Sequence, residues 1–454
     1  MRQFLIIVVC AALPAAAQPL DGFWRSQGYG LVYQFQGGTL KAFEVTSRTC
    51  LPGFTAKSDL GGATFRTADN DVFVIRPGGD HNHRLLHEDG SASDIRIDRV
   101  PRLPSPCDRP TADTPLDNFD VFAQTWAENY ISFDLKHADW NQIVAAARKR
   151  VTAQTSPAGL FDILQSMIQP FGDAHTFLEA PQLKRRFHGY RAGTDRVIKD
   201  MVGETNSDEF RTTGVPKLLA VTDRAYLHGP LRKFCNNQLQ FGKTDDETGY
   251  LRILSFNGYA RGGFAPGAAA LETTLDEIFR DTSLKALVID VCINFGGADP
   301  YGLQIASRLA TGEYLAYTKY ARASPGSADP WTPGDPSMVR PSPRPGFRGP
   351  VVELTGPLTI SAGETFTQAL MGRTPRVTRL GENTQGVFSD VLVRRLPNGW
   401  IFGLPNEVYR TPDGKAFDGP GIPPDIAIPV FAPADIAAGA DPALARAVAI
   451  LRVR

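Results

Sequence analysis

The chain has 454 residues, of which 42% are hydrophobic and 21% charged, an ordinary composition for a folded globular protein. Lysine and arginine together number 48, as do aspartate and glutamate, so the formal net charge is zero. This balance gives no electrostatic support for binding to nucleic acid or to an anionic membrane surface. The length exceeds that of one simple core and predicts two or three domains.

The N-terminus has the pattern of an export signal. Arg2 supplies a positive end, residues 4–13 are apolar but too short to span a bilayer, and residues 15–17 are small alanines suited to cleavage. We therefore expect residues 1–17 to be a signal peptide and the protein to be periplasmic or secreted. A lipid anchor on Cys10 is less favoured, because bulky valines precede it. We expect no membrane-spanning segment after cleavage.

Four cysteines follow the predicted signal, and an even number in an exported chain permits disulfides. Three pairings are open, and no two of these cysteines have the spacing of zinc ligands. We favour a disulfide between Cys50 and Cys107, because these two flank one small predicted domain. The other two cysteines are Cys235 and Cys292.

Residues 18–105 are predicted to form a small β domain. Apolar and polar residues alternate in places over 23–45, with a turn at Gly37-Gly38, and further short strands fit 72–76 and 94–98. Several prolines between 101 and 110 then indicate a linker.

Residues 112–182 are predicted to be a helical region that caps the following domain. Aromatic residues recur there at helical spacing, and two further helices fit 140–151 and 157–168. We interpret these aromatic side chains as core residues. They are Phe119, Phe122, Trp126 and Tyr130.

Residues 185–432 alternate between strands and helices, which predicts an α/β domain. A buried strand is expected at 285–291 from its Leu-Val-Ile run, and a proline-rich loop at 325–350. Residues 433–454 are predicted to be a C-terminal helix. Other expected strands are 250–255 and 351–355, and other expected helices are 271–279, one starting near Asp299, and 362–371.

Ser361 stands where a short loop after a strand enters a helix. The unpaired N–H groups and the positive dipole at such a helix N-terminus suit a developing oxyanion, so Ser361 is a candidate nucleophile. The alternative is that Ser361 only caps the helix, with Glu364 as its capping-box partner.

Two other segments are candidates for the same site. Gly296-Gly297 follows the predicted buried strand and enters a helix, and adjacent glycines let the backbone approach a ligand closely. His175 lies in a polar turn after a predicted helix. Taken alone, the glycines fit an ordinary turn and the histidine fits a structural residue.

Together and in this order, the three segments resemble the C-terminal processing (tail-specific) peptidases and the tricorn protease core. The family pattern Asp-Leu-Arg-x-Asn-x-Gly-Gly is similar to residues 290–297, with Cys292 in place of the arginine. Its Ser-Ala-x-Glu motif matches residues 361–364. Residues 381–386, 396–399 and 419–425 resemble further family motifs, and the resemblance covers roughly 115–430.

The sequence departs from the family pattern in two ways, in its general base and in the lack of a PDZ module. Many members use a lysine directly after the Gly-x-x-Thr-x-Gly element, but Val387 stands there. The resemblance to the tricorn-like branch therefore implies that His175 is the general base and that Asp418 is the orienting acid. The alternative for Asp418 is a turn residue. The usual PDZ module is replaced by a divergent stretch at about 190–248.

The resemblance implies a fold and an activity. The fold is a crotonase-like (ClpP-related) α/β core with an N-terminal helical cap, preceded here by the small β domain. The activity is a serine peptidase without a cofactor, acting on protein or peptide substrates. The resemblance implies an oxyanion hole made by the N–H groups of Gly296, Gly297 and Ala362.

Two other functions are alternatives to this one. Relatives of this fold include non-catalytic modules, so the chain could bind apolar ligands or peptides without cleaving them. A metal-dependent hydrolase would need a ligand set, and the only candidate is a histidine-rich stretch that reads more simply as a polar turn. Its residues are Asp80, His81, His83 and His87.

Overall fold

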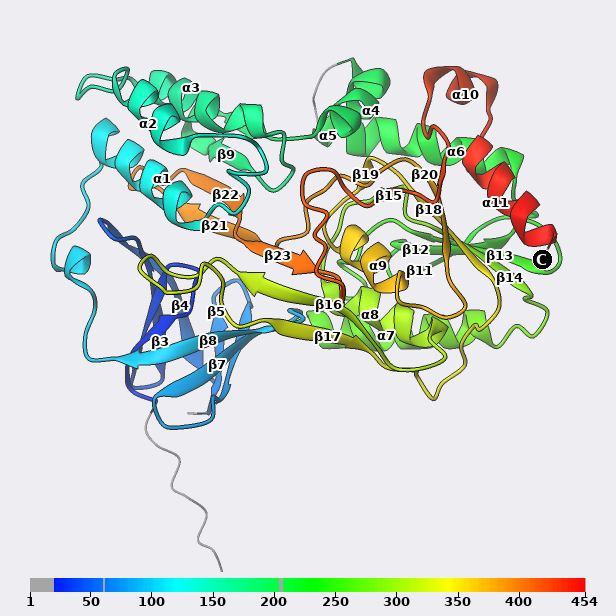
Figure 1. Ribbon diagram of the computed structural model, residues 1–454, viewed down its shortest axis with the longest axis horizontal. Coiled ribbons are helices and arrows are strands. Elements are labelled where there is room, and N and C mark those ends of the chain that lie inside the picture. Colours follow the sequence, from blue (N-terminus) through cyan, green and yellow to red (C-terminus); the bar gives the residue numbers. More distant parts are fainter. Residues whose placement is uncertain (1–19, 60–61, 204–206, 454) are drawn as a thin grey trace, which may run out of the picture.

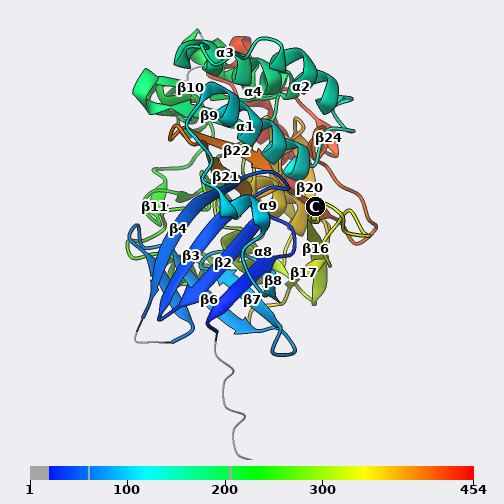
Figure 2. The ribbon, with the colours of Figure 1, turned by 90° about the vertical axis from the view of Figure 1, so that its left-hand side faces the viewer.

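The computed structural model describes residues 20–59, 62–203 and 207–453. The predicted signal peptide lies outside these residues. The first domain is a closed eight-stranded antiparallel barrel in which β1 pairs with β8, at the lower left of Figure 1 and facing the viewer in Figure 2. Its strands are β1 (Gly22–Ser26), β2 (Leu31–Gln36), β3 (Thr39–Val45), β4 (Cys50–Ser58), β5 (Thr64–Thr67), β6 (Val72–Pro77), β7 (His83–Glu88) and β8 (Asp94–Val100).

The barrel closes around a core of aromatic and aliphatic side chains. Side chains alternate across a strand, so each strand sends every second residue inward. Closure removes the exposed edges that an open sheet would present. The inward residues include Trp24, Tyr33, Phe35, Leu40, Phe65, Phe73, Ile75, Leu86 and Ile97.

A disulfide joins the barrel to the linker that follows it. Cys50 on β4 is bonded to Cys107, in a short 3-10 turn, η1 (Ser105–Asp108). This is the pairing that the sequence favoured. Of the remaining cysteines, Cys235 and Cys292 are free and buried.

Three helices form the cap at the upper left of Figure 1: α1 (Pro115–Asn129), α2 (Trp140–Arg148) and α3 (Pro157–Ile168). Each helix is capped at its N-terminus by a side chain that accepts a backbone N–H of the first turn. The capping residues are Thr114, Asp139 and Ser156, in that order. Trp126 is fully buried and packs against Tyr130 and Trp140. The aromatic residues at helical spacing are therefore core residues, as predicted.

The cap rests on a four-stranded sheet that joins distant parts of the chain. Its order is β10 (Arg185–His188), β9 (Phe177–Ala180), β22 (Ile401–Pro405) and β21 (Val391–Arg395). Phe122 of α1 packs against Phe402 of β22. Strands β9 and β22 thus connect the helical region to the C-terminal part of the core.

The core is a seven-stranded sheet covered on both faces, with the order β11-β12-β13-β14-β18-β20-β24. Leu287 and Ile289 of β14 face helices α7 to α9, whereas Val288 between them packs with α11. The strands are β11 (Arg232–Phe234), β12 (Leu239–Lys243), β13 (Thr248–Ile253), β14 (Ala286–Asp290), β18 (Val351–Thr355), β20 (Thr378–Gly381) and β24 (Ile426–Ala427). The helices are α7 (Phe264–Phe279), α8 (Asp299–Leu309), α9 (Ala362–Leu370) and α11 (Pro442–Arg452).

Two smaller sheets connect this core with the site and the barrel. Strands β15 (Ile293–Asn294) and β19 (Leu358–Thr359) pair in parallel just before the two predicted site loops. Strands β17 (Asp335–Val339), β16 (Tyr314–Ala321) and β23 (Glu407–Arg410) reach toward the barrel (Figure 1). There Arg96 of the barrel forms an ion pair with Asp335 at 2.7 Å.

The fold class predicted from sequence is confirmed: an α/β domain preceded by a β domain. Two details were wrong. The C-terminal segment is two helices, α10 (Pro433–Ala438) and α11, because Gly439 adopts a left-handed conformation between them. The proline-rich stretch contains strand β17.

The divergent region carries α4 (Ala192–Val202), α5 (Ser207–Glu209), the π-helical η4 (Phe210–Gly214) and α6 (Val215–Ala225).

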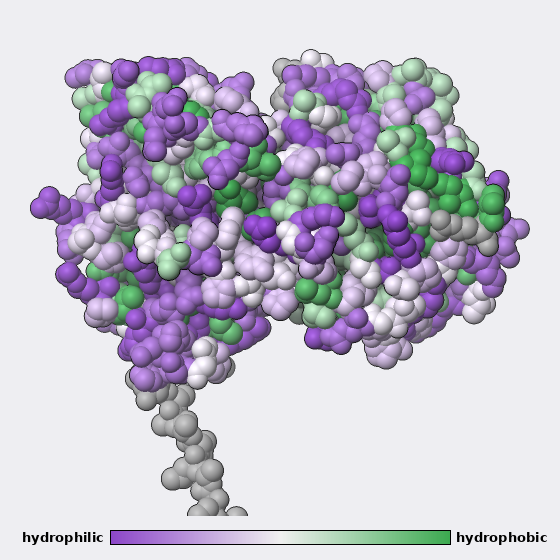
Figure 3. Space-filling model, in the orientation of Figure 1, coloured by the Kyte–Doolittle hydropathy of each residue, from purple (hydrophilic) through white to green (hydrophobic). Residues whose placement is uncertain are grey.

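No helix within the described ranges combines the length and the apolar character needed to cross a bilayer. The face drawn in Figure 3 is notched between the helical cap and the upper part of the core.

Candidate active site

Ser361 occupies a sharp turn between β19 and α9. Its backbone has φ 57° and ψ −121°, a combination that is rare and strained for a residue with a Cβ. The turn ends β19 and starts α9 within three residues, so Ser361 stands at the helix N-terminus. The predicted placement of this serine at a strand-to-helix turn is therefore what the structure shows.

Glu364 stabilises the turn through hydrogen bonds to its buried side chain. Its buried carboxylate accepts N–H groups of Gly386 at 2.6 Å and of Val387 at 2.8 Å, and lies 3.3 Å from the N of Ser361. Burial raises the pKa of Glu364 to about 8, and these donors favour its charged form. Glu364 thus ties the Ser361 turn to the segment that begins at Gly386.

The Gly-Gly loop lies directly against Ser361. A Cβ on Gly296 would fall 2.6 Å from the Ser361 Cβ, and one on Gly297 would fall 2.2 Å from the Phe256 carbonyl oxygen. Both glycines have positive φ, 75° and 136°. No residue with a side chain fits at either position without displacing its neighbours.

The N–H groups of this loop differ in availability. The Gly296 N–H donates to the side-chain oxygen of Asn294 at 2.9 Å. Gly297 and Phe256 form an isolated parallel β-bridge, whose two hydrogen bonds are donated by the N–H groups of Phe256 and Ala298. The Gly297 N–H takes no part in this bridge and points away from Phe256. Within the described part of the chain, neither Gly297 nor Ala362 donates its N–H to an acceptor. The oxyanion role predicted for Gly296 does not fit, because its N–H is already bonded.

His175 lies in the loop between η2 (Gln169–Phe171) and β9. Its backbone N–H donates to Asp173 at 2.9 Å, and the preceding Ala174 packs against Ile360 and Val387, the neighbours of Ser361. The Ala174 carbonyl lies 2.6 Å from Nε2 of His188. The loop therefore presents His175 to the region around Ser361.

The His175 imidazole is buried, and its Nδ1 is unpaired within the described part of the chain. Only 7% of the residue is exposed, and its Nδ1 has no hydrogen-bond partner among the described residues. Burial lowers the pKa of His175 to about 4, against an upward effect from Asp390. The ring is thus neutral at neutral pH and able to accept a proton.

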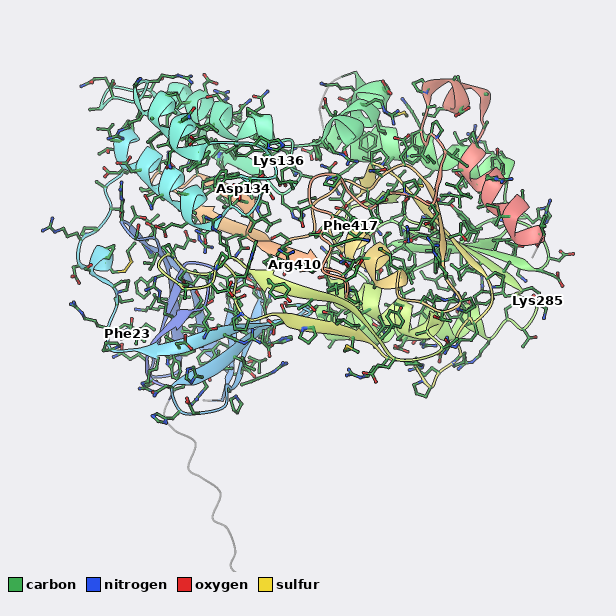
Figure 4. The ribbon with its side chains drawn as sticks, viewed as in Figure 1. Phe23, Asp134, Lys136, Lys285, Arg410 and Phe417 are labelled. Atoms are coloured by element: carbon green, nitrogen blue, oxygen red, sulfur yellow. A yellow bond between two sulfur atoms is a disulfide. The ribbon has the colours of Figure 1, made fainter. Side chains whose placement is uncertain are left out.

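Asp418 lies in a loop that packs against the cap. A Cβ on the next residue, Gly419, would fall 2.8 Å from Leu135, so the loop after β23 lies beside the loop after α1. Figure 4 labels Phe417 in the first of these loops and Lys136 in the second. Arg191 donates to the carbonyls of Pro420 and Thr384 and so fixes the loop.

Asp418 is half-buried, and its Oδ2 atom is shielded from solvent. Burial, and then the charge of Asp173, raise the pKa of Asp418 to about 7. Its Oδ2 has no hydrogen-bond partner among the described residues, as is true of His175 Nδ1. These two atoms are complementary, since a ring N–H can donate to a carboxylate oxygen.

The structure gathers the predicted residues into one region without completing a triad. In the described ranges no hydrogen bond links Ser361 to His175 or His175 to Asp418. Catalytic hydrogen bonds are often long before substrate binds. Sequence reasoning missed Asp173, which accepts the backbone N–H of His175, and Asp390, whose charge acts on its ring. The position of Asp173 two residues before His175 was the available signal for the first.

The geometry bears on two alternatives, a lysine base and a metal site. Val387 is buried beside Ser361, at the position where many members of the resembled family have a lysine, and its carbonyl accepts the Ser361 N–H at 3.2 Å. In the barrel, His83 and His87 pair with separate carboxylates, Asp80 at 2.6 Å and Asp94 at 2.8 Å. The described residues hold no group of three or more ligand-type side chains placed for a metal ion.

Comparisons with known proteins relate the chain to a peptidase family and to solved structures of similar fold. The model of peptidase family S41 matches residues 247–428, which include Ser361, the Gly-Gly loop and Asp418. A proposed peptidase from Parabacteroides merdae ATCC 43184 superposes with a TM-score of 0.60 at 25% identity, over 75% of this chain and 97% of its own. Mature CPAF complexed with lactacystin superposes with a TM-score of 0.54 at 12% identity, over 75% and 98%. No curated protein matches the chain.

Proposed function

Because this chain belongs to peptidase family S41, a family of serine peptidases, we propose that it hydrolyses peptide bonds at the site around Ser361. The observation that carries this proposal is the contact between the Ser361 turn and the Gly-Gly loop. It sets a strained serine beside two backbone N–H groups that have no acceptor in the described chain. Unpaired donors beside a nucleophile suit acyl transfer.

In the proposed reaction, Ser361 Oγ attacks the carbonyl carbon of the scissile peptide bond. His175 takes the hydroxyl proton during attack and later delivers it to the leaving amine. The low pKa of His175 supports its role as a base that is ready at neutral pH. A water molecule then hydrolyses the acyl-enzyme, with His175 again as the base.

The tetrahedral intermediate carries a negative oxygen, which needs donors. We assign these donors to the N–H groups of Gly297 and Ala362, the second at the N-terminus of α9. Loss of one such donor typically costs about 3–4 kcal/mol of transition-state stabilisation. Gly296 contributes by its lack of a side chain, which leaves space for the Ser361 Oγ.

Asp418 is assigned to orient and stabilise the imidazolium. Its unpartnered Oδ2 and the unpartnered Nδ1 of His175 support this assignment, since each would satisfy the other. A carboxylate that accepts the Nδ1 proton fixes the tautomer in which Nε2 can serve as the base.

A fluorophosphonate probe tests the nucleophile directly. Purified protein should become labelled at Ser361, and Ser361→Ala should lose both labelling and peptide hydrolysis while keeping its melting temperature within a few degrees. Peptide mapping of the adduct identifies the residue. Hydrolysis retained by a folded Ser361→Ala variant would remove Ser361 from the mechanism, and no labelling with no hydrolysis would favour a non-catalytic binding protein.

We also infer that the protein is exported, with residues 1–17 removed as a signal peptide. The disulfide between Cys50 and Cys107 supports this, because such bonds persist in oxidising compartments. N-terminal sequencing of protein from the periplasm or the medium should start at Gln18. An intact N-terminus on cytosolic protein would contradict the inference.

A further inference from the structure

A cavity of about 420 Å³ lies between the mouth of the barrel and the core. The barrel supplies one wall, and the segments around β21, β16 and β23 supply the other. The barrel residues that the argument uses are Tyr33, Phe54, Phe73 and Glu88, and the core residues are Lys319, Asp390, Arg394, Asn406 and Glu407.

The charges around this cavity are mainly negative. Five carboxylates line it (Glu44, Asp71, Glu88, Asp390 and Glu407), against two cations. The first cation, Lys319, is already neutralised by Asp390 at 2.7 Å and Glu407 at 3.0 Å. The second, Arg394, donates to backbone carbonyls of Tyr29 and Val393.

Glu88 is the acid left without a partner. In the part of the chain that the structure describes, its carboxylate makes no hydrogen bond and no ion pair. The Glu88 side chain lines the cavity and stays exposed to solvent, near the charge of Asp390. A bound cation would relieve the repulsion between these carboxylates.

One buried polar side chain on the cavity wall also lacks a partner. Asn406 is 1% exposed, and among the described residues its Nδ2 forms no hydrogen bond. Buried polar groups are almost always paired, so this amide points to a ligand with a polar atom of its own. Tyr33, Phe54 and Phe73 line the cavity from the barrel, and the two phenylalanine rings stack at 4.7 Å, an apolar surface for the stem of a long side chain.

The cavity and the catalytic region share one short segment of the chain. Asp390 lines the cavity and is the charged group that acts most strongly on His175. The backbone of its neighbour Ser389 acts to raise the pKa of His175, and the Ser389 hydroxyl accepts the N–H groups of Asn406 and Glu407. One wall of the cavity therefore backs onto the proposed general base.

We propose that this cavity is a substrate subsite that takes a lysine or arginine side chain of the peptide, with Glu88 as the residue that recognises its charge. The proposal rests on the proposed peptidase function. The stacked phenylalanines would hold the aliphatic stem or the guanidinium plane. The Asn406 amide would donate to a peptide carbonyl next to that side chain. The barrel thereby gains a role, which is to supply half of a specificity pocket.

Binding is tested on the Ser361→Ala protein, so that nothing is cleaved. Calorimetry would compare acetyl-Ala-Arg-Ala-amide with the same peptide carrying citrulline, which keeps the shape but lacks the charge. The arginine peptide should bind more tightly, and Glu88→Gln should weaken it by about threefold or more, as expected for one partly exposed ion pair. The matched control is Asp89→Asn, which removes the same charge one residue away and outside the cavity.

Equal affinity for the two peptides, or unchanged affinity in Glu88→Gln, would overturn the proposal. Putrescine, a free diamine, should bind more weakly than the peptide; tighter binding of putrescine would show an amine site and overturn the substrate role.

Kinetics separates this proposal from the peptidase assignment. With active protein, kcat/KM should favour an arginine peptide over its citrulline counterpart, and Glu88→Gln should reduce that preference by about threefold or more while leaving kcat/KM for the citrulline peptide unchanged. An active enzyme with no preference for arginine would refute the subsite alone. Absence of any labelling at Ser361 would instead refute the peptidase function.

Discussion

Gly296 and Ser361 lie so close that a Cβ added to the glycine would stand 2.6 Å from the Cβ of the serine and 3.1 Å from its Oγ. The contact is made by two loops that follow the paired strands β15 and β19. The parallel pairing therefore brings together two motifs that are 65 residues apart in the sequence. It also explains why the motif needs glycine and not merely a small residue.

Gly296→Ala is expected to abolish most of the activity. Alanine would meet Ser361 and would also be strained at φ 75°, at a cost of about 1–3 kcal/mol. Turnover should fall by at least about tenfold, since small displacements at a catalytic site are costly. The control is Gly312→Ala, where a Cβ meets nothing within 4 Å. Wild-type kcat in Gly296→Ala would show that the loop does not shape the site.

Glu364→Gln is expected to loosen the nucleophile turn. A glutamine has one acceptor oxygen and one NH2 group, so an NH2 would face the N–H of Gly386 or of Val387. Leaving a buried donor unpaired costs about 1–3 kcal/mol. A lower melting temperature together with slower fluorophosphonate labelling of Ser361 would agree with this. Glu277→Gln, at an exposed position, is the control.

The parts of the site that sequence could predict are local. The strand-turn-helix pattern around Ser361 and the Gly-Gly turn follow from residues adjacent in the chain. The role of His175 could be predicted only from the family resemblance. No residue near position 175 indicates that this histidine lies close to Ser361, almost 190 positions later in the chain. That proximity depends on β9 pairing with β22, a long-range contact that short apolar segments do not specify.

The residues that sequence missed depend on tertiary contacts. Asp173 and Asp390 are ordinary loop residues by type, and only the fold buries Asp173 and pairs the exposed Asp390 with Lys319. The closure of the barrel was missed for a similar reason, since pairing of β1 with β8 joins the ends of an 80-residue segment and leaves no local pattern. Individual strands such as β6 and β8 were predictable from their apolar and β-branched residues.

Removal of the disulfide is expected to destabilise the protein without changing its catalytic chemistry. The bond closes a loop with a sequence separation of 57 residues, for which the chain-entropy argument gives about 4 kcal/mol. A Cys50→Ala, Cys107→Ala double variant should therefore melt earlier than wild type. Reducing agent should lower the wild-type melting temperature and leave that of the variant unchanged, because both have the same two buried free thiols. Equal sensitivity of the two proteins would place the effect elsewhere.

His175→Gln should lower kcat by about 10²–10⁴, the range for loss of a general base. Stability provides a second readout. The folded-state pKa of His175 is about 4, below its ordinary 6.5, so the folded protein binds fewer protons than the unfolded chain between these values. The wild type should lose stability as pH falls from about 6.5 to about 4, and the glutamine variant should lose less.

His81→Gln, at an exposed turn, is the matched control and should change neither quantity. Thermal melts at pH 5 and pH 7 on all three proteins give the comparison. An equal loss of stability in wild type and His175→Gln would mean that the ring is not held neutral by burial.

Asp418→Asn should lower turnover while making the protein more stable at alkaline pH. The folded-state pKa of Asp418 is about 7, above its ordinary 3.8, so its ionisation opposes folding as pH rises through that interval. Asparagine cannot ionise, and the variant should therefore be more stable than wild type at pH 8 and nearly equal to it at pH 4. A residue that only forms the turn would show little change in kcat, because asparagine serves well in turns.

The pH profile of kcat distinguishes the two roles of Asp418. If the carboxylate must be ionised to stabilise the His175 imidazolium, wild-type activity should rise as pH increases through about 7, the pKa of Asp418. In Asp418→Asn that limb should disappear, and the small remaining activity should rise near pH 4, where His175 itself titrates. Steady-state kinetics from pH 4 to pH 9 on both proteins gives this comparison. A wild-type limb near pH 4 with normal turnover in Asp418→Asn would leave His175 acting without this carboxylate, and Ser361 and His175 would then work as a dyad.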